Sequence, residues 1–353
     1  MAVSKNSAGR LDAEALIIGG GPAGSAAAIV LAQAGLRVML LDAPHRGGAP
    51  RPGEALHPGM EPLLGQLGLA AAFSAAGFTR YPGHHVEWGA DRQFVPFGKD
   101  ASGAWQGFQA WRAVFDPMLR HHAEACGAIV QRDCRALELE VDSDGRPACV
   151  ITGRGPLRAG FVIDASGNRA WLARRLGLTL RQHSPKLVAW FAYIEGASPA
   201  PEAPLFTADP EGWTWRAGVT SDLVQWVRLR FDSPRLDRHG LSQALKDGEL
   251  RHPPAGADVS WREAGPAAGK GYFLVGDAAC RLDPSSSHGV LRAVMSGMMA
   301  GHAVRRHLLD RLPLEQVVVS YRRWLETWFR HDLEQLRAHY ARHPQAPAWC
   351  RAA

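Results

Sequence analysis

The sequence predicts an α/β fold in which a mostly parallel sheet carries helices on both faces and is joined to a smaller antiparallel sheet and a C-terminal helix. Three observations lead to this fold class. Residues 15–41 are nearly uncharged and change from strand to glycine-rich loop, to helix and to strand again. Two later apolar strands, at residues 161–164 and 272–275, run into loops that precede helices. Residues 314–341 repeat apolar side chains at helical spacing.

Composition limits the class of protein. The chain has 353 residues, of which 46% are hydrophobic and 21% charged, so it can bury the core of one large domain or two modest ones. This excludes a disordered tail, a collagen and a disulfide-stapled miniprotein. The net charge of +6 comes almost entirely from arginines scattered along the chain. We therefore expect no nucleic-acid partner, and no Cys or His spacing indicates a metal site.

The cysteines and the N-terminal residues indicate the compartment. The five cysteines form no CxxC pair, and their odd number argues against a disulfide framework. We expect reduced thiols in a cytoplasmic protein. Residues 1–14 lack the apolar core of a signal peptide. The apolar stretch that follows contains three consecutive glycines, Pro22, Gln33 and Arg37, so we expect no stable membrane insertion.

The glycine loop predicts a bound dinucleotide. It forms a GxGxxG pattern between a buried strand and a helix of small residues. Its glycines let the backbone approach a pyrophosphate, whose charge the helix N-terminus stabilises. A second strand ends at Asp42, where the carboxylate is expected to accept hydrogen bonds from a ribose. The loop residues expected to bind the cofactor are Gly19, Gly21, Pro22, Ala23 and Gly24.

A second group of residues indicates which dinucleotide is bound. Gly276-Asp277-Ala278-Ala279 follows an apolar strand, and the run from Asp283-Pro284 to Ser287-His288-Gly289 leads into a helix. This combination resembles the third FAD motif of the flavoprotein monooxygenases with a glutathione-reductase-like fold. The resemblance implies that Asp277 holds the ribityl chain and that the helix N-terminus favours an anionic reduced flavin. It assigns to the flavin site Gly276, Asp277, Pro284, Ser287, His288, Gly289 and Val290.

Two further segments also indicate that the bound dinucleotide is FAD. Residues 161–167 end in Asp-Ala-Ser-Gly, as the corresponding strand does in flavin-dependent halogenases and their relatives. Arg112 begins an R-x-x-F-D pattern that is similar to a helix of the same family, in which the arginine contacts phosphate or flavin. The resemblance implies that Arg112, Asp164 and Gly167 contact the cofactor, and that the cofactor is FAD.

The source of electrons stays open, because the chain carries one dinucleotide fingerprint. The other G-x-G near a strand, at residues 153–155, lacks a third glycine. Either NAD(P)H binds transiently or a separate flavin reductase supplies the electrons. Residues 51–59 resemble a segment of tryptophan halogenases and of a sister group of tryptophan hydroxylases that mature tryptophylquinone cofactors. The chain is identified as a member of this flavin-dependent monooxygenase and halogenase superfamily, nearest to the hydroxylases.

Two departures from the halogenase pattern favour hydroxylation. Trp213-Thr214-Trp215 keeps the tryptophans of a W-x-W-x-I-P motif and lacks its isoleucine and proline. Halogenases carry a lysine eight residues before a tryptophan, but counting back from Trp88 reaches Arg80, whose guanidinium is a poor nucleophile. We therefore expect FAD and O2 to hydroxylate an aromatic group, such as indole or tryptophan, free or in a peptide, through a flavin C4a-hydroperoxide. The alternatives are halogenation, reduction of an isoprenoid-type double bond and a non-catalytic role in binding a partner.

The catalytic candidates and the domain limits complete the expectation. Candidate acid–base residues are Glu54, His57 and His288. Strands at residues 187–194 and 223–231 are expected to supply the sheet of a substrate pocket. The expected units are a discontinuous FAD-binding domain (12–50, 105–180 and 268–312), a substrate-binding domain (51–104 and 181–267) and a C-terminal helical segment (313–343).

Overall fold

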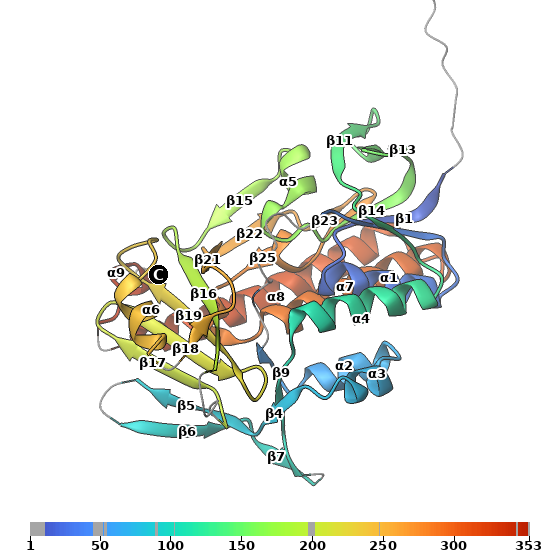
Figure 1. Ribbon diagram of the computed structural model, residues 1–353. Helices are drawn as coiled ribbons and strands as arrows, with labels where there is room; N and C mark the ends of the chain where they lie inside the picture. Colours follow the sequence, from blue (N-terminus) through green and yellow to red (C-terminus); the bar gives the residue numbers. More distant parts are fainter. Residues whose placement is uncertain are drawn as a thin grey trace, which may run out of the picture.

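A six-stranded sheet, five of whose strands run parallel, forms one end of the molecule (Figure 1). The computed structural model describes residues 11–44, 52, 55–88, 91–101, 103–196, 202–246, 248–343 and 345–351. In spatial order the strands are β10 (Ile129–Arg132), β2 (Val38–Asp42), β1 (Ala13–Ile18), β14 (Ala159–Asp164), β24 (Tyr272–Leu274) and β23 (Ala268–Gly269). The chain leaves β1 toward β2 on one side and returns at β14 on the other, which creates a topological switch point between β1 and β14.

Small residues bring the helices of this region close together. A Cβ on Gly297 of helix α7 (Gly289–Leu308) would stand 2.0 Å from the carbonyl oxygen of Ala23 in helix α1 (Pro22–Gln33). Helix α4 (Arg112–Ala125) also contacts α1, and Figure 1 shows all three helices on one side of the sheet. On the other side lie β11 (Ala136–Val141), β12 (Pro147–Thr152) and β13 (Gly155–Leu157), where Val150 joins the same buried core.

The other end of the molecule is a larger, mostly antiparallel sheet (Figure 1). Its central strands bury much of their length and contribute Phe191, Phe206, Trp213 and Leu229 to the second hydrophobic core. In spatial order the strands are β20 (Glu249–Leu250), β16 (Val188–Glu195), β19 (Leu223–Arg230), β18 (Gly212–Gly218), β17 (Leu205–Asp209), β5 (Gly83–Glu87) and β6 (Arg92–Pro96), with β21 (Ala255–Asp258) paired to β16.

Apart from the long helix near the C-terminus, the remaining elements are short. The small sheets are β3 (Ala55–Leu56), β9 (Gly107–Gln109) and β4 (Thr79–Tyr81); β15 (Thr179–Gln182), β22 (Arg262–Gly265) and β25 (Cys280–Arg281); and β7 (Lys99–Asp100) with β8 (Gly103–Ala104). The short α-helices are α2 (Met60–Gln66), α3 (Ala70–Ala75), α5 (Trp171–Arg175), α6 (Arg238–Ala244) and α9 (Ala348–Arg351). The 3-10 turns are η1 (Gly167–Arg169), η2 (Gly276–Ala278) and η3 (Pro284–Ser286).

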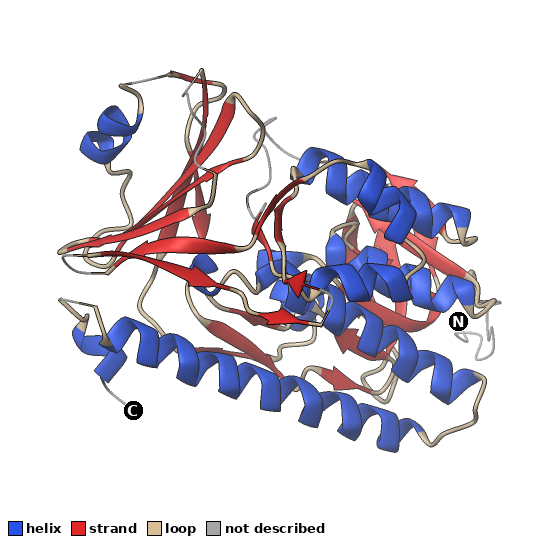
Figure 2. Cartoon of the chain, turned by 90° about the horizontal axis from the view of Figure 1, so that it is seen from below, coloured by secondary structure: helices blue, strands red, loops and turns tan. Residues whose placement is uncertain are grey.

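Helix α8 (Leu314–Ala341) runs along both ends of the molecule; it is the long helix that ends near the C-terminus in Figure 2. Its first half buries Val317, Tyr321 and Leu325 in the core of the parallel sheet. Its second half buries Leu333 and Tyr340 in the core of the antiparallel sheet. The helical spacing seen in the sequence is therefore the pattern of one helix that serves two cores.

This architecture confirms the predicted α/β fold, with its parallel sheet, antiparallel sheet and long C-terminal helix. Among the residues that the structure describes, no helix is both long and apolar enough to cross a membrane.

Candidate active site

A cavity of about 570 Å³ lies between the two sheets. Its floor is made of the loops that follow β1, β2, β14 and β24, at the carboxyl ends of the parallel strands. This is where open α/β sheets bind their ligands, beside the switch point. Its opposite wall is a face of the antiparallel sheet, including Phe191, Phe206, Trp213 and Trp215. The cavity therefore combines a predicted cofactor floor with an aromatic wall.

The glycine loop cannot accept side chains. Gly19 has φ +117°, and a Cβ there would stand 2.3 Å from the carbonyl oxygen of Ala165. A Cβ on Gly20 would stand 2.7 Å from Cγ of Asp42. Gly21 is the N-cap of α1 and supplies no side-chain cap, so the first amides of that helix remain for a ligand. The loop lines the cavity from Gly19 to Ala23, which fits a pyrophosphate against the helix N-terminus.

Gly24 has a different role from the one expected. It is not among the residues that line the cavity. A Cβ there would stand 2.0 Å from the carbonyl oxygen of Gly19 and 3.0 Å from Cβ of Ala165. Gly24 is therefore required for close packing of α1 against its own loop, because the obstacle is protein backbone rather than a ligand.

Asp42 ends β2 and lines the cavity, where a ribose is expected. Sequence reasoning missed its partner, Arg120 of α4. The Arg120 Nε atom lies 3.4 Å from Asp42 Oδ2, and its Nη1 donates to the carbonyl oxygen of Gly20 at 3.0 Å. The signal that could have found Arg120 is its position two turns after Arg112 on one face of the helix.

Arg112 also lines the cavity, but its guanidinium is held by protein groups. Its Nε and Nη2 donate to the two carboxylate oxygens of Asp116 at 2.6 and 2.9 Å, and Nη1 donates to the carbonyl oxygen of Pro52 at 3.0 Å. Asp116 is 3% exposed. The R-x-x-F-D pattern thus encodes a buried bidentate ion pair that presents Arg112 at the cavity edge.

Asp164 supports the loop that follows β14. Its side chain is buried and accepts hydrogen bonds from the backbone amides of Ser166 and Leu172 at 2.9 and 2.8 Å. Burial raises the pKa of Asp164, and these hydrogen bonds oppose the rise. Asp164 does not line the cavity, whereas Ser166 and Gly167 do. It therefore shapes the segment that a cofactor would touch.

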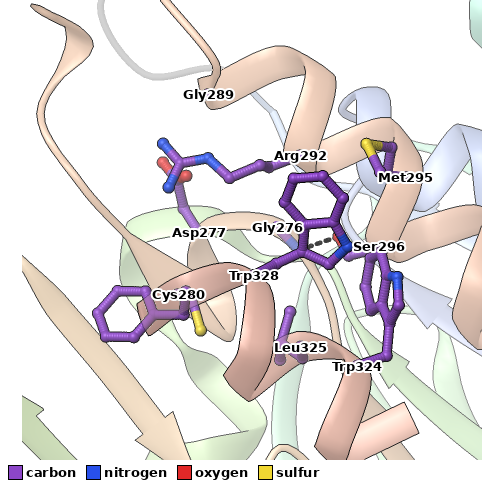
Figure 3. Close-up of a pocket in the computed structure, with 11 residues that line it drawn as sticks. Gly276, Asp277, Cys280, Gly289, Arg292, Met295, Ser296, Trp324, Leu325 and Trp328 are labelled. Atoms are coloured by element: carbon purple, nitrogen blue, oxygen red, sulfur yellow. Dashed lines mark hydrogen bonds between the residues drawn. The ribbon is translucent and has the colours of Figure 1, made fainter. Parts of the chain in front are cut away.

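Asp277 stands where two cavities meet. Gly276 (φ +55°) and Asp277 line the large cavity and also a small one of about 30 Å³ between α7 and α8. Figure 3 draws the small cavity and shows the guanidinium of Arg292 directed at the Asp277 carboxylate. Burial raises the pKa of Asp277, and nearby arginines, led by Arg281 and Arg292, oppose the rise. The carboxylate is thus the countercharge of a cationic cluster under the cofactor floor.

The structure brings two catalytic candidates together. The rings of His57 and His288 meet edge to face, with centroids 5.1 Å apart. The backbone amide of Gly59 donates to Nδ1 of His57 at 3.0 Å, which places the proton of the neutral ring on Nε2. Neither histidine lines the large cavity, although Ser287 and Gly289 beside His288 do. Glu54, the third candidate, lies outside the described residues.

Both histidines are held in the neutral form. Burial lowers the pKa of His57, and burial together with His57 and Arg292 lowers the pKa of His288 to about 4. A neutral imidazole accepts a proton or donates a neutral N–H. The pair is therefore not a source of imidazolium near neutral pH.

Replacing His288 tests this conclusion. A folded-state pKa below the ordinary 6.5 means that the unfolded chain takes up a proton first as pH falls, so stability is lost between about 6.5 and about 4. We expect His288→Gln to lose less thermal stability than the unsubstituted protein between pH about 7.5 and about 5. His121→Gln, at an exposed position on α4, is the control. An equal loss of stability in all three proteins would contradict a depressed pKa at His288.

The aromatic wall comes from four neighbouring strands. Trp213 packs against Phe206 with ring centroids 5.3 Å apart, and Trp215 lies 6.1 Å from the ring of His84. Gln225 of β19 is buried and adds an amide to the same wall. A wall of neighbouring rings with a nearby amide suits a planar aromatic guest, which can stack on the rings.

An unsatisfied glutamine supports the fit of a polar ligand. Gln109 ends β9, is 1% exposed, and neither its Oε1 nor its Nε2 has a hydrogen-bond partner among the described residues. It pairs with Ala55 of β3, which lines the cavity. Buried amides without partners are costly, so a site with this feature accommodates a ligand that carries hydroxyl or amide groups. Gln109 is not itself among the residues that line the cavity, so the glycine floor carries the fit to the phosphate groups of FAD, and Gln109 is a candidate for one further contact beside Ala55.

Comparisons with known proteins agree with this geometry. The FAD binding domain family matches residues 12–216. The tryptophan 2-halogenase of Chondromyces crocatus is 28% identical over 89% of this chain. The 1H-pyrrole-2-carbonyl-[peptidyl-carrier protein] brominase of Pseudoalteromonas luteoviolacea is 26% identical over 88% of it. The crystal structure of CmlS, a flavin-dependent halogenase, superposes with a TM-score of 0.85 and 22% identity, over 96% of this chain and 67% of that one. The chain spans 65% of the length of the tryptophan 2-halogenase and 81% of that of the brominase.

Proposed function

The chain belongs to the FAD binding domain family, and on that premise we propose that it is a flavin-dependent halogenase that acts on an aromatic compound. FAD is its cofactor, and the sequence-based identification of the flavin-dependent monooxygenase and halogenase superfamily is confirmed. The observation that carries the proposal is the similarity to named halogenases along nearly the whole chain. The aromatic wall opposite the cofactor floor supports it.

The expectation of hydroxylation is wrong, because the relatives that share most of this chain are named halogenases. That expectation depended on two departures from the halogenase pattern: the incomplete W-x-W-x-I-P motif at Trp213 and Arg80 at a position expected to be lysine. In the structure Arg80 is exposed, donates to Glu61 Oε1 at 3.0 Å, lies over the ring of Phe108 and does not line the cavity. Its identity therefore says nothing about the chemistry inside the cavity.

Lysine is absent from the cavity wall in the part of the chain that the structure describes. The four lysines described there, Lys99, Lys186, Lys246 and Lys270, are all exposed. The proposed reaction therefore depends on how the aromatic and polar groups of the wall hold the substrate against the cofactor floor, and on the exclusion of water.

Each part of the cavity has a role in this proposal. Reduced FAD, when bound, supplies the reducing equivalents with which O2 is activated. The glycine loop and the N-terminus of α1 bind the pyrophosphate, and Asp42 binds a ribose. Asp277 and the loop from Pro284 to Val290 hold the flavin end. Phe206, Trp213 and Trp215 hold a planar substrate on the opposite side.

The partners follow from the same site. We propose that the substrate is an aromatic small molecule, free or carried on a peptide or protein, since one relative is named for a carrier-bound pyrrole. Of the two electron sources that the single dinucleotide fingerprint leaves open, we propose a separate flavin reductase. We place the protein in the cytoplasm, consistent with its five free cysteines.

A turnover assay tests the proposed activity. The protein is loaded with FAD and given O2, bromide, NADH and a separate flavin reductase, with tryptophan, indole and pyrrole-2-carboxylate as acceptors. We expect a brominated product, recognised in the mass spectrum by the twin isotopes of bromine. Reactions that omit the protein or the FAD are the controls. Hydrogen peroxide alone from every acceptor would count against the proposal.

Substitution of Gln109 is expected to raise the stability of the FAD-free protein and to lower its affinity for FAD. Gln109→Leu removes two unsatisfied polar atoms at nearly constant volume, so the FAD-free protein should gain about 1 kcal/mol or more in stability. The affinity for FAD should fall about fivefold, since one hydrogen bond to the cofactor is worth about 1 kcal/mol. Thermal unfolding without FAD and a flavin-fluorescence titration measure the two effects. Unchanged affinity would show that Gln109 does not face the cofactor.

A further inference from the structure

A buried chain of hydrogen bonds joins segments that are far apart in the sequence. The indole Nε1 of Trp213 donates to the hydroxyl of Tyr340 at 2.7 Å. That hydroxyl donates to Oδ2 of Asp283 at 2.8 Å. The Nε1 of Trp261 donates to the same carboxylate oxygen at 2.7 Å. All four residues are 0–1% exposed, so water does not compete for these contacts.

The same carboxylate shapes the loop that faces the flavin site. Oδ1 of Asp283 accepts from the amide and the hydroxyl of Ser285, at 3.0 and 2.5 Å. Asp283 is thereby the N-cap of the turn η3, from which Pro284 and Ser285 line the cavity. A displacement of the Asp283 carboxylate would therefore change the position of this turn.

Tyr340 lies behind both the aromatic wall and the cofactor floor of the cavity. Trp213 belongs to the aromatic wall, and Asp283 belongs to the cofactor floor. Tyr340 lines neither wall, because it lies on the second half of α8 and is enclosed by the rings of Phe231, Trp261 and Trp349. Its single hydroxyl accepts from one wall and donates to the other, which uses its donor and one of its acceptor positions.

The hydroxyl keeps its proton under ordinary conditions. Burial raises the pKa of Tyr340, with Asp283 adding to the rise. Burial also raises the pKa of Asp283, while hydrogen bonds from Ser285, Tyr340 and Trp261 oppose that rise. The hydrogen bonds from Trp213 through Tyr340 to Asp283 thus form a bridge. Its geometry defines the separation of the aromatic wall and the cofactor floor.

We propose that Tyr340 is a positioning residue that fixes the distance between the aromatic wall and the flavin-side loop, and so determines which aromatic rings fit the cavity. This inference deepens the proposed function, because it takes the aromatic guest from it. It predicts that loss of the hydroxyl changes the affinity for aromatic ligands and the environment of the flavin, while FAD itself still binds.

Tyr340→Phe tests the inference, with Tyr321→Phe as a matched control. Tyr321 lies on the same helix, is 1% exposed, and donates one hydrogen bond at 2.6 Å to the carbonyl oxygen of Leu274, which does not line the cavity. We expect both variants to bind FAD, with the larger loss of thermal stability in Tyr340→Phe, which leaves the buried Nε1 of Trp213 without its acceptor. Only Tyr340→Phe should weaken the binding of indole to the FAD-loaded protein by about tenfold, as measured by quenching of flavin fluorescence. It should also shift the absorption band of the bound flavin.

Trp213→Phe provides a second test, because it removes the Nε1 donor and keeps an aromatic ring. We expect the same shift of the flavin band, and no further loss of indole affinity when it is combined with Tyr340→Phe, since both substitutions break one bridge. Indole affinity and flavin absorption in Tyr340→Phe that match those of Tyr321→Phe would overturn the inference. Both readouts are binding measurements, so they hold even if the protein proves not to halogenate its ligand.

Discussion

Asp277→Ala is expected to yield a protein that folds but no longer retains FAD. Asp277 lines the cofactor floor, and the resemblance to the third FAD motif assigns its carboxylate to the ribityl chain. It is also the countercharge for Arg292 and for the arginines around it, so its removal leaves a buried positive cluster. Loss of hydrogen bonds to a charged group is worth about 1.5–3 kcal/mol, which corresponds to roughly 10- to 150-fold in affinity.

Asp332→Ala is the matched control for this prediction. Oδ2 of Asp332 in α8 lies 3.3 Å from Nη1 of Arg292, and Asp332 is 7% exposed and does not line the large cavity. The Asp332→Ala substitution removes one carboxylate from beside the same arginine and leaves the cofactor floor unchanged. We expect Asp332→Ala to be yellow and Asp277→Ala to be colourless after identical purification. Full flavin content in Asp277→Ala would remove Asp277 from the cofactor site.

Gly24→Val is expected to abolish FAD binding by a different route. Its Cβ would stand 2.0 Å from the carbonyl oxygen of Gly19, so the glycine loop must move before any ligand is present. Overpacking of this kind costs about 1–3 kcal/mol, and here the displaced backbone is the cradle for the pyrophosphate. We expect a lower unfolding temperature and no bound flavin.

Gly65→Val distinguishes this clash from a general effect of valine on a helix. Gly65 lies in α2, and a Cβ there meets no atom within 4 Å. This variant should keep its flavin and nearly all of its stability. A yellow Gly24→Val protein with an unchanged flavin spectrum would show that the loop tolerates the displacement.

The cofactor floor could be predicted from the sequence because its signals are local. The spacing of Gly19, Gly21 and Gly24 and the position of Asp42 follow from a few consecutive elements, and the structure places the loop and Asp42 at the cavity. The resemblance to known flavoproteins added Asp277 in the same way. The role of Gly24 needed the structure, because its obstacle is the carbonyl oxygen of another residue.

The remaining parts of the site depend on contacts between distant segments. Nothing in the sequence near Tyr340 indicates that its hydroxyl meets Asp283 and Trp213, which lie 57 and 127 residues away. The unpaired amide of Gln109 likewise becomes visible only in the folded chain, where β9 lies beside β3, and the contact of Arg120 with Asp42 needs α4 to be placed beside the glycine loop. Sequence spacing also misled at Arg80, since residue counting cannot show that a side chain points away from the cavity.

The halogenase assignment is tested most directly by the halide dependence of one reaction. The FAD-loaded protein, a flavin reductase, NADH, O2 and the aromatic compound that binds most tightly are combined with and without bromide, and the products are identified by mass spectrometry. We predict a brominated product when bromide is present and no modified aromatic product when it is omitted. An oxygenated product that forms equally with and without bromide would contradict the assignment.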